Sequence, residues 1–274
     1  MSSKNTNNRL VRESYSSNQT EAVFRENRLA GFDPLWRLDA PWFEAPNERR
    51  AGISGVVTWD LVGPGGQSWP VFIKRQHNHN TRTLKHPLKG VPTFYREHRN
   101  ITYLNKLGVP TIEVLYYGEQ ASTDGTKAIL VSRALDGYVS LEDWLNSSAE
   151  KDEVVVASVL EQIVAAIKPM HQHRIRHGCL YGKHVFLKFF SDNGIATQGR
   201  TAVDVRLLDL EKAHFSLFKN RIITKDLSQL LRHSGPILRA QVANLALLYF
   251  GAAKQQYWLT RLKKQIQGKS KSKG

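Results

Sequence analysis

His177-Gly178-Cys179-Leu180-Tyr181-Gly182-Lys183-His184 is the most informative stretch of this 274-residue chain. It is a polar loop that precedes two apolar runs, Val185–Phe189 and Val203–Leu208. These runs flank a turn signal at Asp192-Asn193-Gly194 and therefore predict a β-hairpin. Asp209-Leu210-Glu211 comes directly after the second run, so a carboxylate follows a strand of alternating apolar residues.

A long helix is predicted upstream of this loop, because apolar residues recur there at the spacing i, i+3, i+4, i+7. The stripe consists of Val156, Val159, Leu160, Ile163, Val164, Ile167 and Met170. We expect this helix to be buried along one side and to end or kink at Pro169. A shorter helix over Ser140–Leu145 is capped by Ser140 with Asp143. Beyond Lys225 the chain again has a helical pattern, notably over Leu238–Leu262.

The first half of the chain is predicted to be mainly β-structure. Ile53–Leu61 and Pro70–Lys74 are β-prone runs, and the turn Gly63-Pro64-Gly65-Gly66 joins them into a hairpin. His77–Pro92 is predicted to be a loop that leads into a helix beginning near Thr93.

That helix carries a carboxylate on its apolar side. Its apolar residues Phe94, Ile101 and Leu104 repeat at helical spacing, and Gly108 with Pro110 supplies the stop signal. Glu97 falls on the same stripe, where it needs a partner because an unpaired buried charge is very costly. The alternative is a Glu at the helix edge whose side chain reaches solvent. Two further β-like runs follow, Ile112–Tyr117 and Ala128–Ser132.

Strands with one helix are thus followed mainly by helices with one hairpin, which indicates an α+β protein of two lobes. The lobes are predicted to divide near Arg133–Tyr138, with the N-lobe over 21–135 and the C-lobe over 136–266. Residues 1–20 are rich in Ser, Asn and Thr and are predicted to be disordered. Residues 267–274 are predicted to be a basic tail, with Lys263 and Lys264 already part of an unstructured basic segment.

Four features occur in an order typical of the protein kinase fold. Lys74 ends a strand, Glu97 lies on the next helix, the 177–184 loop follows the long helix, and Asp209 follows a strand. The His-x-x-x-Tyr-x-x-His loop and the Asp-Leu ending resemble the lipopolysaccharide kinase family, particularly its InaA branch. The resemblance covers residues 49–233. It implies a protein-kinase-like bilobal fold, with a small β-rich N-lobe and a larger, mainly helical C-lobe.

The resemblance implies ATP and Mg²⁺ as cofactors and assigns the main roles. Lys74 would hold the α- and β-phosphates, and Glu97 would orient Lys74 through an ion pair. Asp209 would bind Mg²⁺, since a hard carboxylate suits that ion. His184 takes the position of the second metal ligand, although imidazole is a poorer ligand for Mg²⁺ than oxygen groups. Phosphoryl transfer needs little covalent help, because it rests on positioning and on neutralising phosphate charge.

The remaining nucleotide contacts are carried over in the same way. Gly52 and Gly55 occupy the place of the phosphate loop, where glycine lets backbone N–H groups approach phosphate oxygens. A plain hairpin turn is the alternative. Ser132 and Ala134 belong to the segment that would face adenine. Asp226 resembles the residue that braces the catalytic loop, or it is a simple N-cap.

Cys179 is the main departure from the family pattern, because active members carry an Asp there that accepts or orients the acceptor hydroxyl. A thiol has an ordinary pKa of about 8.5 and is mostly protonated at pH 7, so it cannot replace a carboxylate in that task. The chain is therefore either catalytically degenerate or relies on positioning and metal. A third hypothesis is that His177 activates Cys179 as a nucleophile. A buried structural cysteine is the commoner case.

Composition limits the partners and the compartment. The 39 Lys and Arg residues against 24 Asp and Glu give a net charge of +15, which favours polyanions such as nucleotides, anionic glycolipids and membrane surfaces. The basic residues are spread along the chain, which argues against nucleic acid as the partner. Cys179 is the one cysteine, which excludes an internal disulfide and indicates a reducing compartment. Met1–Thr20 lacks the apolar core of a secretory signal, and no uncharged apolar run approaches about 18 residues.

The sequence leaves three hypotheses for function. The first is an ATP-dependent phosphotransferase that acts on a sugar hydroxyl, with the lipopolysaccharide core as the expected acceptor, in the cytoplasm or peripherally at the inner membrane. The second is a pseudokinase that binds nucleotide or regulates a partner; Cys179 favours it. The third is a basic nucleic-acid-binding protein unrelated to kinases. Nucleotide binding with and without Mg²⁺ would separate the first two from the third.

Overall fold

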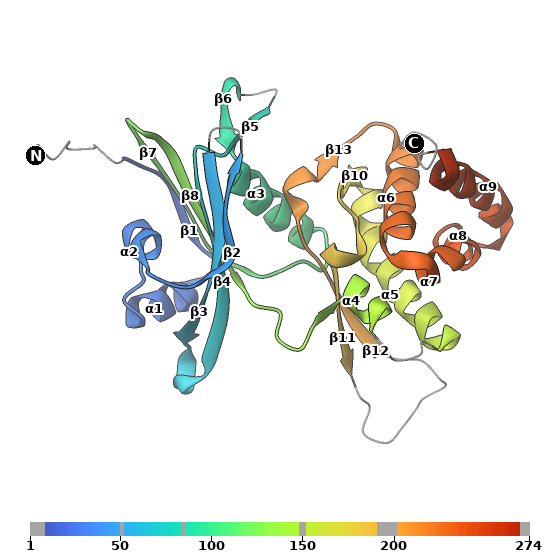
Figure 1. The fold of residues 1–274 in the computed structure, drawn as a ribbon, viewed down its shortest axis with the longest axis horizontal. Coiled ribbons are helices and arrows are strands. Elements are labelled where there is room, and N and C mark those ends of the chain that lie inside the picture. The colour runs from blue at the N-terminus through green and yellow to red at the C-terminus, as the bar shows by residue number, and fades with distance from the viewer. Residues whose placement is uncertain (1–8, 50–51, 84–85, 148–151, 191–201, 269–274) are drawn as a thin grey trace, which may run out of the picture. The chain divides into compact units, whose positions relative to one another are not determined.

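The structure of the protein is a computed structural model that describes residues 9–49, 52–83, 86–147, 152–190 and 202–268. The chain divides into two units (Figure 1). The first unit comprises Met1–Thr102 with Ile112–Leu135, and the second comprises Tyr103–Thr111 with Asp136–Gly274. The first is built on a large antiparallel sheet and the second mainly on helices, as the α+β prediction requires.

Six antiparallel strands form the sheet of the first unit. In spatial order they are β1 (Arg9–Tyr15), β7 (Val114–Ser122), β8 (Gly125–Arg133), β4 (Ser68–His77), β3 (Gly52–Val62) and β2 (Trp42–Arg49). The predicted hairpin is confirmed, because β3 and β4 pair from Ile53 and His77 through to Val62 and Ser68. A short 3-10 turn, η1 (Pro64–Gly66), closes it, and Gly65 has a positive φ of 69° that glycine adopts without strain.

Helices cover both faces of this sheet. On one face, α1 (Asn18–Glu26) and α2 (Phe32–Arg37) contribute Phe24 and Leu35 to a core with Val71 and Ile73 of β4. The other face packs against α3 (Thr93–Lys106), which lies on the opposite side of the sheet in Figure 1. Because side chains alternate along a strand, Phe72 and Lys74 point to the face opposite to that of Val71 and Ile73.

Two predictions for the first unit are wrong in part. Residues 9–20 are ordered: β1 pairs with β7 at the edge of the sheet, and α1 begins at Asn18. Composition hid this strand because its polar side chains are satisfied by β7. Arg12 forms an ion pair with Glu119 at 2.6 Å, and Tyr116 donates a hydrogen bond to Glu13 at 2.7 Å.

The second correction concerns the predicted loop over residues 77–92. It contains a two-stranded ladder of β5 (Asn80–Thr83) and β6 (His86–Pro92). Its strands are short and polar and carry no alternating apolar pattern. The sequence therefore lacked the signal by which half-buried strands are recognised.

The second unit is built around α5 (Glu153–Gln172). Its apolar stripe is buried as predicted, and Ile163, Ile167 and Met170 are fully covered. The other helices are α4 (Leu141–Asn146), α6 (Lys219–His233), α7 (Gly235–Ala240), α8 (Val242–Phe250) and α9 (Ala252–Gly268). The predicted hairpin is confirmed as β11 (Val185–Phe190) with β12 (Ala202–Leu207), joined on the β11 side by β9 (Val139–Ser140). The predicted turn at 192–194 lies outside the described residues.

α5 is also the one described helix long and apolar enough to cross a membrane by length and composition. This is weak support for a membrane span, because 56% of its most apolar window is buried inside the unit. Burial against the rest of the unit is the expected behaviour of a core helix.

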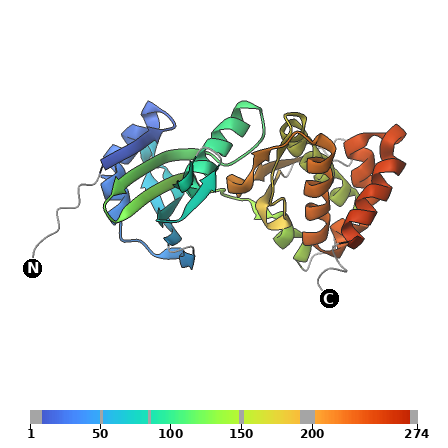
Figure 2. The same ribbon diagram turned by 90° about the horizontal axis from the view of Figure 1, so that it is seen from above.

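Three boundaries in the second unit differ from prediction. Pro169 neither ends nor interrupts α5, which continues to Gln172. The helical stretch over 238–262 is three helices, broken at Gln241 and at Gly251, whose φ is +79°. α9 includes Lys263 and Lys264 and reaches Gly268, so the basic segment begins later than predicted. α8 and α9 pack side by side (Figure 2), where the rings of Phe250 and Trp258 stack at 4.2 Å.

Candidate functional site

Lys74 and Glu97 form the ion pair that the sequence predicted. The Lys74 Nζ lies 2.6 Å from Glu97 Oε1. Only 3% of the Glu97 side chain is exposed, against 25% for Lys74. The solvent-edge alternative for Glu97 is therefore wrong, because its carboxylate is buried and compensated by a charge-assisted hydrogen bond.

The position of Glu97 follows from how α3 is attached to the sheet. The buried side chain of Gln76 in β4 accepts a hydrogen bond at 2.9 Å from the backbone N–H of Phe94, in the first turn of α3. Ile101 and Leu104 continue the buried stripe of the same helix. One strand thus carries both Lys74 and the group that anchors the helix bearing its partner.

An aromatic pair lies on the sheet face that carries Lys74, and sequence reasoning missed it. Phe72 precedes Lys74 by two residues and so shares its face. Its ring meets that of Phe43 in β2 edge to face, with centroids 5.0 Å apart, and 63% of Phe43 is exposed. The alternation of β4 could have placed Phe72, but Phe43 could not be found without knowing that β2 joins this sheet.

Gly52 and Gly55 lie in β3, beside the β2–β3 connection at residues 50–51 that falls outside the described residues. A Cβ on Gly52 would stand 2.4 Å from the Asn78 backbone, and one on Gly55 would stand 2.5 Å from the ring of Trp42. Both glycines therefore have a packing reason that is independent of nucleotide. Their role toward phosphate stays a prediction.

Ser132 and Ala134 lie at the end of β8 and just beyond it. Ser132 is buried and pairs with Phe72 across the ladder. The backbone N–H of Ala134 donates to the carbonyl of Pro70 at 2.9 Å, and that of Arg133 donates to Glu113 at 2.9 Å. These two donors are used inside the unit, so adenine recognition would fall to other backbone groups of this segment.

In the second unit, Asp226 braces the loop that begins at His177. Its carboxylate accepts from the backbone N–H groups of His177 at 2.7 Å and Gly178 at 3.2 Å, from His171 Nε2 at 3.2 Å and from Arg176 Nε at 3.2 Å. Asp226 lies in the middle of α6, so the N-cap alternative is wrong. Burial acts to raise the pKa of this carboxyl, but the hydrogen bonds that it accepts and its interactions with His171 and His177 outweigh burial and hold the pKa below its ordinary value.

The loop itself requires glycine at Gly178. Its φ is +86°, and a Cβ there would lie 2.8 Å from the carbonyl oxygen of Lys212. Lys212 belongs to the 3-10 turn η3 (Leu210–Lys212) that follows Asp209. The close approach of these two backbones brings the Cys179 loop and the Asp209 turn together.

His177 is fully buried, and its ring is held neutral. Its Nδ1 accepts from the backbone N–H of Cys179 at 3.3 Å, so the ring hydrogen is on Nε2. Nε2 has no hydrogen-bond partner among the described residues. Desolvation lowers the pKa of His177 to about 4, because the imidazolium form would be a buried charge.

We expect His177 to make the protein less stable as the pH falls from about 6.5 to about 4. In this window the unfolded chain protonates His177 and the folded chain does not, so the unfolded state binds more protons and unfolding becomes easier. The loss should reach roughly 3 kcal/mol, from about 1.4 kcal/mol per pKa unit. Urea unfolding across this pH range measures it.

His177→Asn removes the titrating group and keeps an acceptor for the Cys179 N–H, so it should flatten the pH dependence. His173→Asn is the control, because His173 is exposed and lies outside the buried loop. If the free energy of unfolding depends on pH equally in the wild type and in His177→Asn, the buried imidazole does not cause the loss of stability.

Cys179 is buried, and burial raises the pKa of its thiol. The Lys212 ammonium hydrogen-bonds the thiol and acts in the opposite direction without reversing the shift. With a raised thiol pKa and a lowered His177 pKa, a thiolate–imidazolium pair is disfavoured on both sides, and His177 Nδ1 is already used by the Cys179 N–H. Both observations argue against the hypothesis that His177 activates Cys179 as a nucleophile. Lys212, three residues after Asp209, was missed by the sequence analysis.

Asp209 has the left-handed conformation, with φ 57° and ψ 54°. Such residues cluster at functional sites, where the surrounding structure maintains them. Its Oδ2 lies 3.4 Å from Nε2 of His184. That the two side chains bind a metal together stays a prediction.

The position of the hydrogen on the His184 ring determines which contact its Nε2 can make with Asp209 Oδ2. His184 Nδ1 is 2.8 Å from the carbonyl oxygen of Cys179, which can only accept, so Nδ1 carries the hydrogen. A neutral ring with its hydrogen on Nδ1 would direct an Nε2 lone pair at a carboxylate oxygen. This contact is favourable only with a proton or a cation between the two atoms. No cluster of three or more His, Cys, Asp or Glu suited to a metal occurs among the described residues.

Comparisons with known proteins agree with this geometry. The model of the lipopolysaccharide kinase (Kdo/WaaP) family matches residues 33–249. Protein InaA of Escherichia coli (strain K12) is 31% identical over 223 residues, which is 80% of this chain and 95% of InaA. A solved structure of WaaP in complex with acyl carrier protein superposes with a TM-score of 0.63 at 18% identity, covering 93% of this chain and 99% of WaaP.

The WaaP likeness establishes the fold, and the family match with the InaA identity establishes the relationship. The predicted bilobal kinase-like fold is thereby confirmed. This chain belongs to the lipopolysaccharide kinase (Kdo/WaaP) family.

Proposed function

We propose that this protein transfers a phosphoryl group from ATP to a sugar hydroxyl of the lipopolysaccharide core. Its family supports a kinase-like phosphotransferase that uses ATP and a divalent cation. The observation that carries the proposal is the buried Lys74–Glu97 pair at 2.6 Å. A lysine that is paired with and oriented by a buried carboxylate is suited to hold phosphate oxygens.

The second unit supplies the residues that would hold the metal. Asp209 provides a carboxylate, and His184 Nε2 lies 3.4 Å from it. This donor set fits Mg²⁺, which is usually bound by one or two protein groups together with substrate phosphates and water. The bound ion would neutralise phosphate charge and fix the phosphates in place.

Asp226 and Gly178 act by positioning. Asp226 fixes the backbone of the loop through the N–H groups of His177 and Gly178, so the carbonyl of Cys179 stays directed at His184. Cys179 leaves this loop position without the carboxylate of the family pattern. The acceptor hydroxyl would therefore be positioned by the loop and deprotonated late, which a loose transition state tolerates.

A pseudokinase is the second candidate. Three observations favour it: the raised pKa of Cys179, the internal use of the Ala134 N–H, and the bulk of Phe72 beside Lys74. A pseudokinase would bind nucleotide, as the first candidate does, but would not transfer the phosphoryl group. Under either candidate we place the protein in the cytoplasm, peripherally at the inner membrane in the case of a glycolipid acceptor.

Nucleotide binding in the presence and absence of Mg²⁺ tests the common part of both candidates. Lys74→Met should weaken ATP binding roughly 10- to 100-fold, since a hydrogen bond to a charged group contributes about 1.5–3 kcal/mol. Isothermal titration calorimetry measures it. Lys106→Met is the control. It removes an exposed lysine at the end of α3, the helix that carries Glu97, and should bind ATP like the wild type. Equal affinity of Lys74→Met and wild type would contradict the assignment of Lys74.

A further inference from the structure

The acidic residues of this chain are distributed far less evenly than the basic ones. From Lys212 to Gly274 there are thirteen Lys and Arg and a single carboxylate side chain, Asp226. Asp226 is buried and bound by four donors, so it contributes no free negative charge to the surface. The second half of the C-lobe thus presents one sign of charge.

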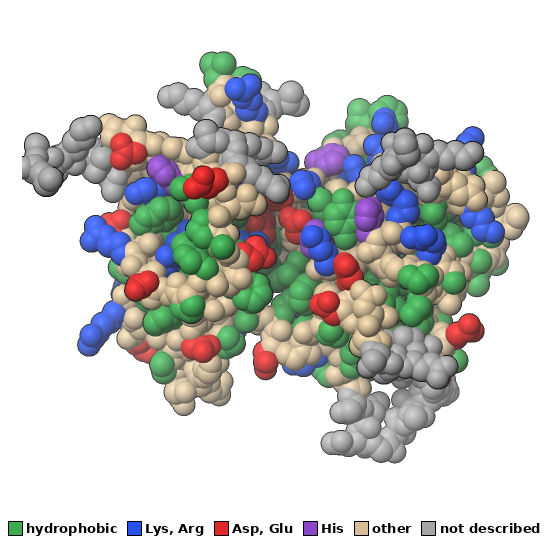
Figure 3. Space-filling model, viewed as in Figure 1, with side chains coloured by type: hydrophobic (Ala, Val, Ile, Leu, Met, Phe, Trp, Pro, Cys, Tyr) green, Lys and Arg blue, Asp and Glu red, His purple; other side chains and the backbone are tan. Residues whose placement is uncertain are grey.

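An apolar segment lies at the surface of the same region. Phe215, Leu217 and Phe218 connect β13 (His214–Phe215) to α6, and their exposed fractions are 61%, 69% and 66%. Single exposed apolar residues are ordinary, but three within four positions form a patch that calls for a partner. Figure 3 shows hydrophobic and basic side chains next to one another at the top of the second unit, where β13 leads into α6.

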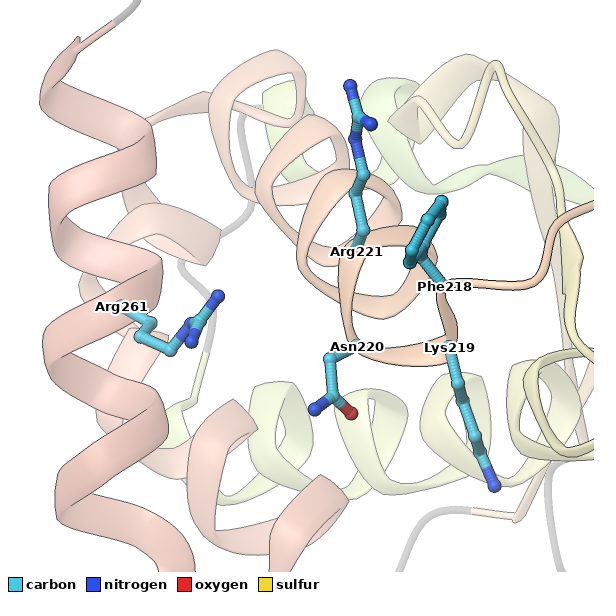
Figure 4. Close-up of a pocket in the computed structure, with 5 residues that line it drawn as sticks. All are labelled: Phe218, Lys219, Asn220, Arg221 and Arg261. Carbon is cyan, nitrogen blue, oxygen red and sulfur yellow. The ribbon is translucent and has the colours of Figure 1, made fainter.

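The patch borders a hollow lined by cations. Phe218, Lys219, Asn220 and Arg221 from the start of α6 and Arg261 from α9 surround a volume of about 390 Å³. In Figure 4, Arg261 extends from α9 toward Asn220, while Phe218 and Arg221 stand on one side of α6. Arg261 is held by Tyr257, whose hydroxyl accepts from it at 2.7 Å. Lys219, Arg221 and Arg261 make no ion pair with any residue that the structure describes.

We propose that these residues form a docking surface for an anionic phospholipid membrane, with Leu217 and Phe218 inserted among the lipids and Lys219, Arg221 and Arg261 on the headgroups. The chemistry is complementary on both counts: apolar side chains gain by leaving water, and each basic residue near an anionic leaflet contributes about 1 kcal/mol. An acidic protein is the alternative occupant, and the experiment below distinguishes it from a membrane.

The surface is continuous with the loop of the proposed active site. β13 pairs with β10 (Ile175–Arg176), so Phe215 lies opposite Ile175, two residues before His177. The backbone N–H of Ser216 donates to the carbonyl of Arg174 at 2.9 Å. Docking through this segment would therefore bring the Cys179 loop to the membrane, where a lipid-anchored acceptor is found. This link deepens the proposed function, but membrane binding itself does not depend on it.

The test is co-sedimentation of the full chain, without ATP, with phosphatidylcholine vesicles that contain or lack phosphatidylglycerol. The wild type should bind only the anionic vesicles and be released by salt. The triple variant Lys219→Glu, Arg221→Glu, Arg261→Glu should bind at least roughly 100-fold more weakly, at about fivefold per charge removed. Its control, Arg9→Glu, Arg28→Glu, Arg37→Glu, changes the net charge equally at exposed positions of the first unit.

The apolar part has its own pair of variants. Leu217→Ser with Phe218→Ser should weaken binding roughly 100-fold or more at unchanged charge, because two buried apolar side chains contribute about 1.5–3 kcal/mol each. The control is Leu10→Ser with Val154→Ser, which changes two exposed apolar residues elsewhere and should leave vesicle binding unchanged. Because Cys179 is buried, Leu217→Cys can be labelled selectively with an environment-sensitive fluorophore, whose emission should shift to the blue on anionic vesicles.

Three outcomes overturn the proposal: no binding of the wild type, equal losses in the two charge-reversal triples, or unchanged binding of the Leu217, Phe218 double variant. An acidic protein that requires these residues in the absence of vesicle binding would assign the surface to a protein instead. Turnover on detergent-dispersed lipopolysaccharide is measured separately, so a failure of membrane docking and a failure of the proposed activity can be told apart.

Discussion

Replacement of Asp209 is expected to abolish phosphoryl transfer. Without its carboxylate the metal loses its charged protein ligand, and the phosphate charge is no longer neutralised. Because metal-ion stabilisation contributes several kcal/mol, the loss should be roughly 10³-fold or more in kcat. The assay is ATP turnover with purified lipopolysaccharide, alongside a nucleotide titration with Mg²⁺.

Two substitutions at this position separate charge from conformation. Asp209→Ala removes the ligand but also places a residue that disfavours the left-handed region at a φ of 57°. Asn tolerates that region, so Asp209→Asn removes the charge with less strain. Asp136→Ala, at an exposed position of the same unit, is the control. Normal turnover in Asp209→Asn would contradict the metal role.

Cys179→Asp should raise phosphoryl transfer by about 10²–10⁴-fold, the typical range for a positioned general base. Lys212 already lies beside this side chain and would stabilise the new carboxylate in its charged form. Nucleotide affinity should stay near its starting value, because Lys74 is unchanged. Cys179→Asn has the same shape and no charge, so it should not produce the gain.

The outcome also separates the two candidate functions. In a working kinase Cys179→Ala should cost little, since a protonated buried thiol is a poor base. In a pseudokinase none of the Cys179 or Asp209 variants should transfer phosphate, while the Asp209 variants alone lose Mg²⁺-dependent nucleotide binding. If Cys179→Ala eliminates transfer in an otherwise active protein, the thiol is an essential group and its assignment here is wrong.

The elements that local pattern determines could be predicted from the sequence. The β3–β4 hairpin, α3 with its inward Glu97, and the buried stripe of α5 are each recorded in the periodicity of apolar residues over short windows. The order of Lys74, Glu97 and Asp209 along the chain indicated the protein kinase fold, and the 177–184 loop with the Asp209-Leu210 ending carried the resemblance to the family. Periodicity said nothing of β1, whose side chains are polar because β7 satisfies them.

Only the tertiary structure decided which polar groups meet. Asp226 binds the backbone of His177 and Gly178 across 49 and 48 residues of chain. The family resemblance offered this bracing role beside an N-cap, and only the structure decided between the two. Three further contacts were also decided by the fold: Lys212 lies beside Cys179, the ring of Phe43 packs against that of Phe72, and Arg261 lies next to the first turn of α6. The physical reason is that a buried polar group takes whatever partner the packing of distant elements brings within hydrogen-bond distance. Sequence spacing determines the face on which a side chain lies, whereas its partner depends on the fold.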